Sequence, residues 1–192
     1  MKGGPEKSLR EKNIFCEGTL HFWGKAMPEK NVHFSSASNE WCSPDVVLER
    51  VYAVFGKVDL DPCSNLGIAN VRAENYFTVN DDGLRKTWFG NVYMNPPYGR
   101  EISRWVDKAY ASYRKGDVNA VIALLPARTD TYWFLKLSNF HCCFIMGRLK
   151  FVGATSSAPF PSAAFFIGDY PETFDREFSK IGNVYALVRG WG

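Results

Sequence analysis

The chain has 192 residues and a mass of 21.8 kDa, which is the usual size of one domain. Hydrophobic residues make up 46% of it and charged residues 22%, so one core is possible and disorder is excluded as the main state. The net charge of +3 is too small by itself to indicate a nucleic-acid or membrane partner. The charge is uneven, however, because residues 99–153 hold nine basic and four acidic side chains.

The five cysteines are typical of a reduced protein that binds no metal. They form no Cys-x-x-Cys pair, and no histidine lies beside them at the spacing of metal ligands. Their odd number argues against a complete disulfide framework, and nothing like a secretory signal opens the chain. No apolar run approaches the roughly 20 residues of a membrane span. We therefore expect a metal-free protein of the cytoplasm without a membrane partner.

The organisation along the chain predicts an N-terminal segment at 1–35 that is partly flexible, followed by one domain at 36–192. Ser43 is expected to cap a helix over 45–55, with Pro44 in its first turn and Gly56 after its end. The apolar patterns then predict strands at 57–61 and 91–94, a helix that contains 102–113, a strand at 120–125, a short helix after Asp130, and strands at 141–146, 149–152, 163–167 and 184–188.

This alternation of strands and helices predicts an α/β fold. Several strands are apolar throughout, which favours a largely parallel central sheet with helices on both faces. Ligands of such sheets bind beyond the carboxyl ends of the strands. Asp61, Asn95 and Pro126 fall at three predicted carboxyl ends, so we expect them to surround one crevice.

The segment Asn95-Pro96-Pro97-Tyr98 is the most informative for chemistry. It either forms a simple turn with Tyr98 packed, or it serves methyl transfer to a planar amine such as adenine N6. In the second case the Asn95 side-chain oxygen and the Pro96 carbonyl each accept one N–H of the amine and stabilise its developing positive charge. The prolines restrict the backbone, and Tyr98 offers a face on which a base can stack.

Two acidic segments are candidates for the cofactor side of the crevice. Asp61, which Pro62 and Cys63 follow, ends a strand and either holds the ammonium group of a methionine-like cofactor or only caps a turn. Asp81 and Asp82 form either a solvated turn or a contact to the ribose or adenine of the cofactor.

Basic side chains beside aromatic ones follow the next two predicted strands. Arg128 lies near Trp133, and Arg148 and Lys150 precede Phe151. This pattern is typical of a rim that binds phosphates. The alternative is ion pairs on a solvated face with both aromatic rings in the core, and the residues alone leave the choice open.

Taken together, seven segments resemble the phage-type DNA N6-adenine methyltransferase (Dam) family, in the family's order from about Ser36 to Ile167. They are Asn39-Glu40-Trp41-Cys42-Ser43-Pro44, Asp61-Pro62, Asp81-Asp82-Gly83-Leu84 with Trp88, Asn95-Pro96-Pro97-Tyr98-Gly99, Leu124-Leu125-Pro126-Ala127-Arg128-Thr129-Asp130-Thr131 with Trp133-Phe134, Gly147-Arg148-Leu149-Lys150-Phe151 and Ala158-Pro159-Phe160-Pro161-Ser162. The fourth and fifth segments are the most specific.

The resemblance implies a Rossmann-like fold and an enzyme that transfers the methyl group of S-adenosylmethionine to N6 of adenine in double-stranded DNA. Because N6 cannot be reached inside a duplex, the base would be flipped out. Residues 95–98 would be catalytic. The cofactor would contact Trp41, Ser43, Pro44, Asp61, Pro62, Cys63, Asp81, Asp82 and Asn95, and DNA would contact Arg128, Asp130, Trp133, Arg148 and Lys150. One departure is that the glycine-rich turn after Asp61 is reduced to Gly67.

Other functions share parts of this pattern. The same motif serves the methylation of cytosine N4 in DNA, of RNA, or of a glutamine amide in protein. A non-catalytic DNA-binding module with a decayed methyltransferase fold is a further alternative, which the reduced glycine turn favours and the intact Asn95-Pro96-Pro97-Tyr98 opposes. The resemblance places the protein in the cytoplasm of a bacterium or of a phage-infected host.

Overall fold

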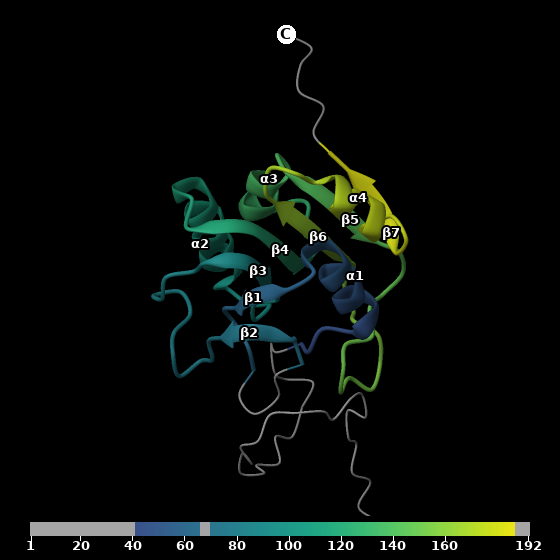
Figure 1. The fold of residues 1–192 in the computed structure, drawn as a ribbon. Coiled ribbons are helices and arrows are strands. Elements are labelled where there is room, and N and C mark those ends of the chain that lie inside the picture. Colours follow the sequence, from purple (N-terminus) through teal and green to yellow (C-terminus); the bar gives the residue numbers. More distant parts are fainter. Residues whose placement is uncertain (1–40, 66–69, 187–192) are drawn as a thin grey trace, which may run out of the picture.

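The computed structural model describes residues 41–65 and 70–186, which build a mixed α/β fold around one seven-stranded sheet (Figure 1). The strands are β1 (Val58–Asp61), β2 (Ala73–Tyr76), β3 (Gly90–Met94), β4 (Val118–Pro126), β5 (His141–Ile145), β6 (Ser162–Ile167) and β7 (Gly182–Tyr185). The helices are α1 (Asp45–Phe55), α2 (Ile102–Lys115), α3 (Tyr132–Leu137) and α4 (Glu172–Phe178). The spatial order of the strands is β2-β1-β3-β4-β6-β5-β7.

The sheet is parallel in one half only, so the prediction of a largely parallel sheet is wrong. β2, β1, β3 and β4 pair in parallel. β6 pairs antiparallel with both β4 and β5, and β7 pairs antiparallel with β5. The error has a physical cause, because β6 is buried at all six positions and has the continuous apolar sequence of a parallel strand. A continuous apolar run indicates that both faces of the strand are buried, and it does not depend on whether the strand is parallel or antiparallel to its neighbours.

Helices cover both faces of this sheet. α1 contacts α4 on one face, and α2 contacts α3 on the other (Figure 1). The predicted apolar side of α2 is buried, including Ile102, Trp105 and Val106, and Gly116 ends the helix in a left-handed conformation with φ of 77°. β4 lies at the centre of the sheet and is buried from Ala120 to Pro126.

Some predicted elements differ from the structure. β2 and α4 were not predicted; β2 has four residues and is mostly exposed, and α4 has seven residues. The strand predicted at 149–152 is present only as an isolated bridge between Cys42 and Val152. Ser43 does not cap α1, because Pro44 is the N-cap and no side chain caps the helix. The segment 1–35, Asn39, Glu40, Gly67 and the end of the strand predicted at 184–188 lie outside the described residues.

The strand directions bring several loops to one edge of the sheet. β1, β3 and β4 are parallel, and β5 points the same way because both β4 and β5 are antiparallel to β6. Their carboxyl ends therefore share one edge, which we call the carboxyl edge. The loop after β5 (green) reaches the segment before α1 there (Figure 1), where the Val152 N–H donates to the Cys42 carbonyl at 3.0 Å.

Membrane helices and metal clusters are both absent from the described residues. No helix in 41–65 or 70–186 is long and apolar enough to cross a membrane. The same part of the chain holds no group of three or more His, Cys, Asp or Glu side chains that could bind a metal ion.

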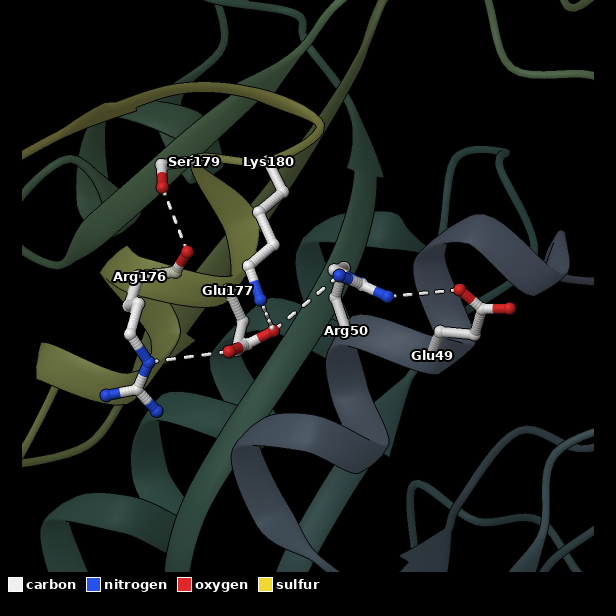
Figure 2. A network of polar contacts seen from close by, with 6 residues as sticks. All are labelled: Glu49, Arg50, Arg176, Glu177, Ser179 and Lys180. Atoms are coloured by element: carbon white, nitrogen blue, oxygen red, sulfur yellow. Dashed lines mark hydrogen bonds and ion pairs between the residues drawn. The ribbon is translucent and has the colours of Figure 1, made fainter.

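A network of ion pairs joins α1 to α4 on one face of the sheet (Figure 2). Glu177 of α4 is only 8% exposed, and its carboxylate lies 3.6 Å from Arg50 Nη1 of α1 and 2.6 Å from Lys180 Nζ. The hydrogen bond from Lys180 holds the pKa of Glu177 below its ordinary value of 4.5, and Arg176 adds to the effect. The network connects two helices that are far apart in the sequence.

We predict that Glu177→Gln lowers the melting temperature by a few degrees at pH 7. The substitution removes the acidic partner on α4 from Arg50, whose Nε is already buried without a hydrogen bond. Because folding depresses the pKa of Glu177, its stabilisation is complete above pH 4.5 and is lost as the pH falls through the depressed value. Thermal unfolding from pH 3 to 7 should show a difference that shrinks in acid.

The matched control is Glu49→Gln, which removes an exposed carboxylate that pairs with the same arginine. Exposed pairs contribute little, so this variant should unfold close to the wild type. Two substitutions that lower the melting temperature equally would contradict a stabilising role of the Glu177 carboxylate. So would a Glu177→Gln effect that does not change with pH.

Candidate active site

Asn95 directly follows β3, and hydrogen bonds fix the orientation of its side-chain amide. Its Nδ2 donates to the backbone carbonyl of Trp41 and to Ser43 Oγ, the latter at 2.9 Å. A backbone carbonyl can only accept, so the contact with Trp41 identifies the nitrogen end of the amide. The other end, Oδ1, is buried and accepts no hydrogen bond within the described structure. A buried acceptor without a partner is costly, which suggests that an external N–H donor completes it.

Ser43 and Tyr93 lie behind this amide. The Ser43 Oγ and Tyr93 hydroxyl oxygens are 2.7 Å apart, and the two residues are 1% and 0% exposed. Tyr93 comes two residues before Asn95, so both side chains lie on the same side of the strand. Burial raises the pKa of Tyr93 well above its ordinary value, so its hydroxyl stays protonated. Three side chains therefore form one chain of hydrogen bonds.

Asp61 ends β1 and is 6% exposed. Its Oδ1 accepts a hydrogen bond from the Cys63 backbone N–H at 3.1 Å, and this bond and the nearby side chains of Cys63 and Ser64 act to lower its pKa. Burial nevertheless raises the pKa of Asp61 from 3.8 to about 6. None of the groups that shift this pKa is a basic side chain. The carboxylate is thus a buried acid without a compensating cation among the described residues.

One small pocket connects Asp61 to Asn95. It is lined by Ser43, Asp61, Cys63, Ser64, Asn65, Asn70, Val71 and Asn95. The two strand-end side chains that the sequence placed around one crevice are therefore neighbours. A larger hollow beside β7 contains one ionisable pair, His141 and Asp175, which is partly exposed, so it holds no comparable set of buried polar groups.

The turn over 78–83 packs against the end of β1. A Cβ atom at Gly83 would lie 2.0 Å from the Pro62 carbonyl oxygen, so only glycine permits this approach. Asp81 accepts hydrogen bonds from the N–H and hydroxyl of Thr78 at 2.9 and 2.8 Å, and these bonds lower its pKa. Asp82 is exposed and has a φ of 52°. These contacts are those of a solvated turn.

Tyr98 belongs to a cluster of four aromatic rings with Trp41, Phe151 and Phe160. The ring centroids of Trp41 and Phe151 are 5.1 Å apart, and those of Tyr98 and Phe160 are 5.5 Å apart. Tyr98 is 5% exposed, and its hydroxyl donates to the Leu124 carbonyl at 3.1 Å. The structure therefore places this ring in a packed cluster, and it does not present the exposed stacking face that the sequence suggested.

Comparison with protein families identifies the chain. Residues 31–167 match the family described as DNA N-6-adenine-methyltransferase (Dam). This range contains every residue that lines the pocket between Asp61 and Asn95. The chain belongs to the Dam family. The resemblance seen in the sequence is thus confirmed, whereas a comparison with curated proteins gives no match.

The charged residues predicted to contact DNA lie at the carboxyl edge of this Dam-family chain. Arg128 and Asp130 are exposed in the loop after β4, and Arg148 and Lys150 are exposed after β5. None of the three basic residues forms an ion pair with another described residue, which favours a rim over a solvated ion-pair face. Trp133 is different, because it is 7% exposed and its ring packs 5.8 Å from that of Phe134. Its place is in the core, as the alternative interpretation expected.

Sequence reasoning missed Tyr93, which contacts the predicted residue Ser43. Tyr93 could have been found from its spacing, because residues 93 and 95 of a strand share a side and a buried tyrosine hydroxyl needs a partner.

Asp61 should make the stability of the protein depend on pH. A carboxyl whose pKa rises on folding binds its proton more tightly in the folded state, so stability falls as the pH rises from about 4 to about 6 and is constant above. Asp61→Asn removes this loss, on the order of 3 kcal/mol for a shift of this size. Melting curves should show that the melting temperature of Asp61→Asn rises relative to that of the wild type as the pH increases across this range.

The exposed Asp117→Asn variant controls for the loss of one negative charge. A difference between Asp61→Asn and the wild type that stays constant from pH 4 to 7 would contradict the raised pKa.

Proposed function

We propose that this protein is an S-adenosylmethionine-dependent DNA adenine N6-methyltransferase with a Rossmann-like fold. The observation that carries the proposal is the Asn95 amide, which has both N–H groups engaged and a buried oxygen without a partner. This amide opens the Asn-Pro-Pro-Tyr motif at the carboxyl edge of a chain that belongs to the Dam family. An acceptor in this position suits an amine as the group to be methylated.

The proposed role of Asn95 and Pro96 is to bind the two N–H groups of adenine N6. The lone pair of this nitrogen is delocalised into the ring, which makes the amine a poor nucleophile. Acceptors on both N–H groups favour a pyramidal nitrogen and stabilise the positive charge that develops on it, an effect that elsewhere contributes 10²–10³ in rate for one group, roughly. The nitrogen gains a methyl group and afterwards loses one proton, so no strong base is required. The adenine is flipped out of the duplex to reach this site.

The residues around Asp61 fit the amino-acid end of S-adenosylmethionine. A cationic ammonium group would compensate the buried carboxylate, which has no basic side chain acting on its pKa. Ser64, Asn65 and Asn70 add polar groups to the same pocket. When bound, this cofactor supplies an electrophilic methyl group. We leave Asp81 and Asp82 out of the proposed cofactor set, because the carboxylate of Asp81 is used within its own turn and Asp82 is exposed beside it.

We propose that Arg128, Arg148 and Lys150 bind the DNA backbone. They are exposed on two neighbouring loops of the carboxyl edge and have no acidic partners among the described residues. Phosphate contacts of this kind supply affinity and position the duplex without reading its sequence. Tyr132, which is 84% exposed at the start of α3, follows Arg128 by four residues and is an exposed ring on which a base could stack.

The first experiment incubates the purified protein with S-adenosylmethionine and unmethylated bacterial DNA and measures N6-methyladenine by mass spectrometry. We expect clear product from the wild type and a loss of at least about 100-fold for Asn95→Ala. Calorimetry should show nearly normal cofactor binding by this variant. Asp61→Ala is the matched variant from the other end of the pocket, and it should chiefly weaken cofactor binding.

The products separate the alternatives. N4-methylcytosine, or methyl groups only on RNA or protein, would change the acceptor but keep the chemistry. A wild-type protein that does not bind S-adenosylmethionine would contradict the proposal and favour a non-catalytic module.

The DNA-binding role of the basic residues predicts a change in salt dependence. Substituting Arg148 or Lys150 with alanine should weaken binding to any duplex and reduce the slope of log K against log salt by about 1 for each phosphate that is no longer neutralised. Arg114→Ala is the control, because Arg114 is exposed at the end of α2, at the opposite edge of the sheet. An equal decrease of slope in the control would show that binding follows net charge alone.

A further inference from the structure

We propose that Ser43 and Tyr93 are positioning residues, which hold the Asn95 amide with its oxygen toward the amine that is methylated. The inference rests on the proposed function and adds two residues to it. Neither the cofactor nor the base needs to touch Tyr93, which is fully buried and does not line the pocket. Its effect would pass through Ser43 to Asn95.

The orientation of the amide needs to be held because its two ends have almost the same shape. A half-turn about the last side-chain bond exchanges Oδ1 and Nδ2, and only hydrogen bonds distinguish the two states. In the exchanged state Oδ1 would face the Trp41 carbonyl and Nδ2 would face the amine. Acceptor would then meet acceptor and donor would meet donor, so only the observed orientation can bind an amine N–H.

Ser43 provides the second of the two bonds that hold the amide. Its oxygen accepts the Asn95 Nδ2 hydrogen at 2.9 Å, which adds to the bond with Trp41. The backbone of Ser43 is itself held, because Asn70 Nδ2 donates to its carbonyl at 2.6 Å. Without the hydroxyl, one N–H of this part-buried amide would lose its partner.

Tyr93 fixes the direction of the Ser43 hydroxyl. The two oxygens are 2.7 Å apart, and whichever of them donates, Ser43 Oγ keeps a lone pair for Asn95. Among the described residues, Ser43 is the hydrogen-bond partner of the Tyr93 hydroxyl. The serine is therefore held between a fully buried phenol and the catalytic amide.

The test compares Tyr93→Phe, Ser43→Ala and Ser43→Thr. We expect Tyr93→Phe to lower kcat about tenfold, with the KM for DNA and the Kd for S-adenosylmethionine within about twofold of the wild type. Ser43→Ala should lower kcat further, because it removes the direct bond, and Ser43→Thr should recover part of the rate because it keeps a hydroxyl. The control is Tyr113→Phe, which removes a tyrosine hydroxyl bonded to Asp169 away from the site and should leave kcat unchanged.

A second measurement does not depend on activity. The side-chain amide protons of Asn95, followed by NMR in the cofactor-free protein, should exchange slowly in the wild type and faster in Tyr93→Phe and Ser43→Ala. Melting temperatures report separately whether a variant is only destabilised.

The outcomes distinguish the inference from the function on which it rests. A wild type that forms no methylated base would overturn both. A methylating wild type whose Tyr93→Phe and Ser43→Ala variants keep its kcat, or show wild-type exchange of the Asn95 amide, would overturn the positioning role alone.

Discussion

The site depends on one constraint, which is that polar atoms at the carboxyl ends of β1 and β3, the Asp61 carboxylate and the Asn95 Oδ1, are removed from water and need hydrogen-bond or ionic partners. Asp61 is covered because β1 lies between β2 and β3, and it accepts a hydrogen bond from the Cys63 N–H. The Asn95 Nδ2 finds its hydrogen-bond partners in a distant part of the sequence, because it donates to the carbonyl of Trp41 and the hydroxyl of Ser43. The segment before α1 is therefore part of the site, and the aromatic cluster with the loop after β5 holds it there.

Two requirements of these polar groups remain unmet within the described residues, and each is of a kind that a bound ligand meets. The Asn95 oxygen lacks a donor, and the Asp61 carboxylate lacks a cation. Leaving a buried polar group unsatisfied costs about 1–3 kcal/mol, so a ligand that supplies the missing partner recovers that free energy on binding. An amine N–H and an ammonium group are the complements, which is why one pocket accounts for both the methyl acceptor and the methyl donor of the proposed reaction.

The sequence alone predicts what depends on local pattern and misses what depends on neighbours. The apolar runs of β4 and β6, the amphipathic α2 and the positions of Asp61 and Asn95 at strand ends are local features, and these predictions were confirmed. β6 and β7 run against the other strands, which a largely parallel sheet did not predict; in β6 the reason is that burial on both faces produces the same apolar run in either direction. For Tyr98 the sequence left a packed ring and a stacking face both open, because its burial depends on Phe151 and Phe160, which come from a loop more than fifty residues later in the chain.

Ser43 was correctly placed at the candidate site, but the helix-capping role predicted for it was wrong. A serine before a helix normally caps it, at a gain of about 1 kcal/mol. Here the Pro44 carbonyl accepts from the N–H groups of Val47 and Leu48 at 3.0 and 3.2 Å, and no side chain caps α1. The serine hydroxyl bonds instead within the site, where a missing partner would leave buried polar atoms of Asn95 and Tyr93 unsatisfied. Because α1 is also fastened to α4 through Arg50 and Glu177, the helix that begins beside Ser43 is anchored independently of the pocket. The site is thereby preorganised by contacts that lie outside it.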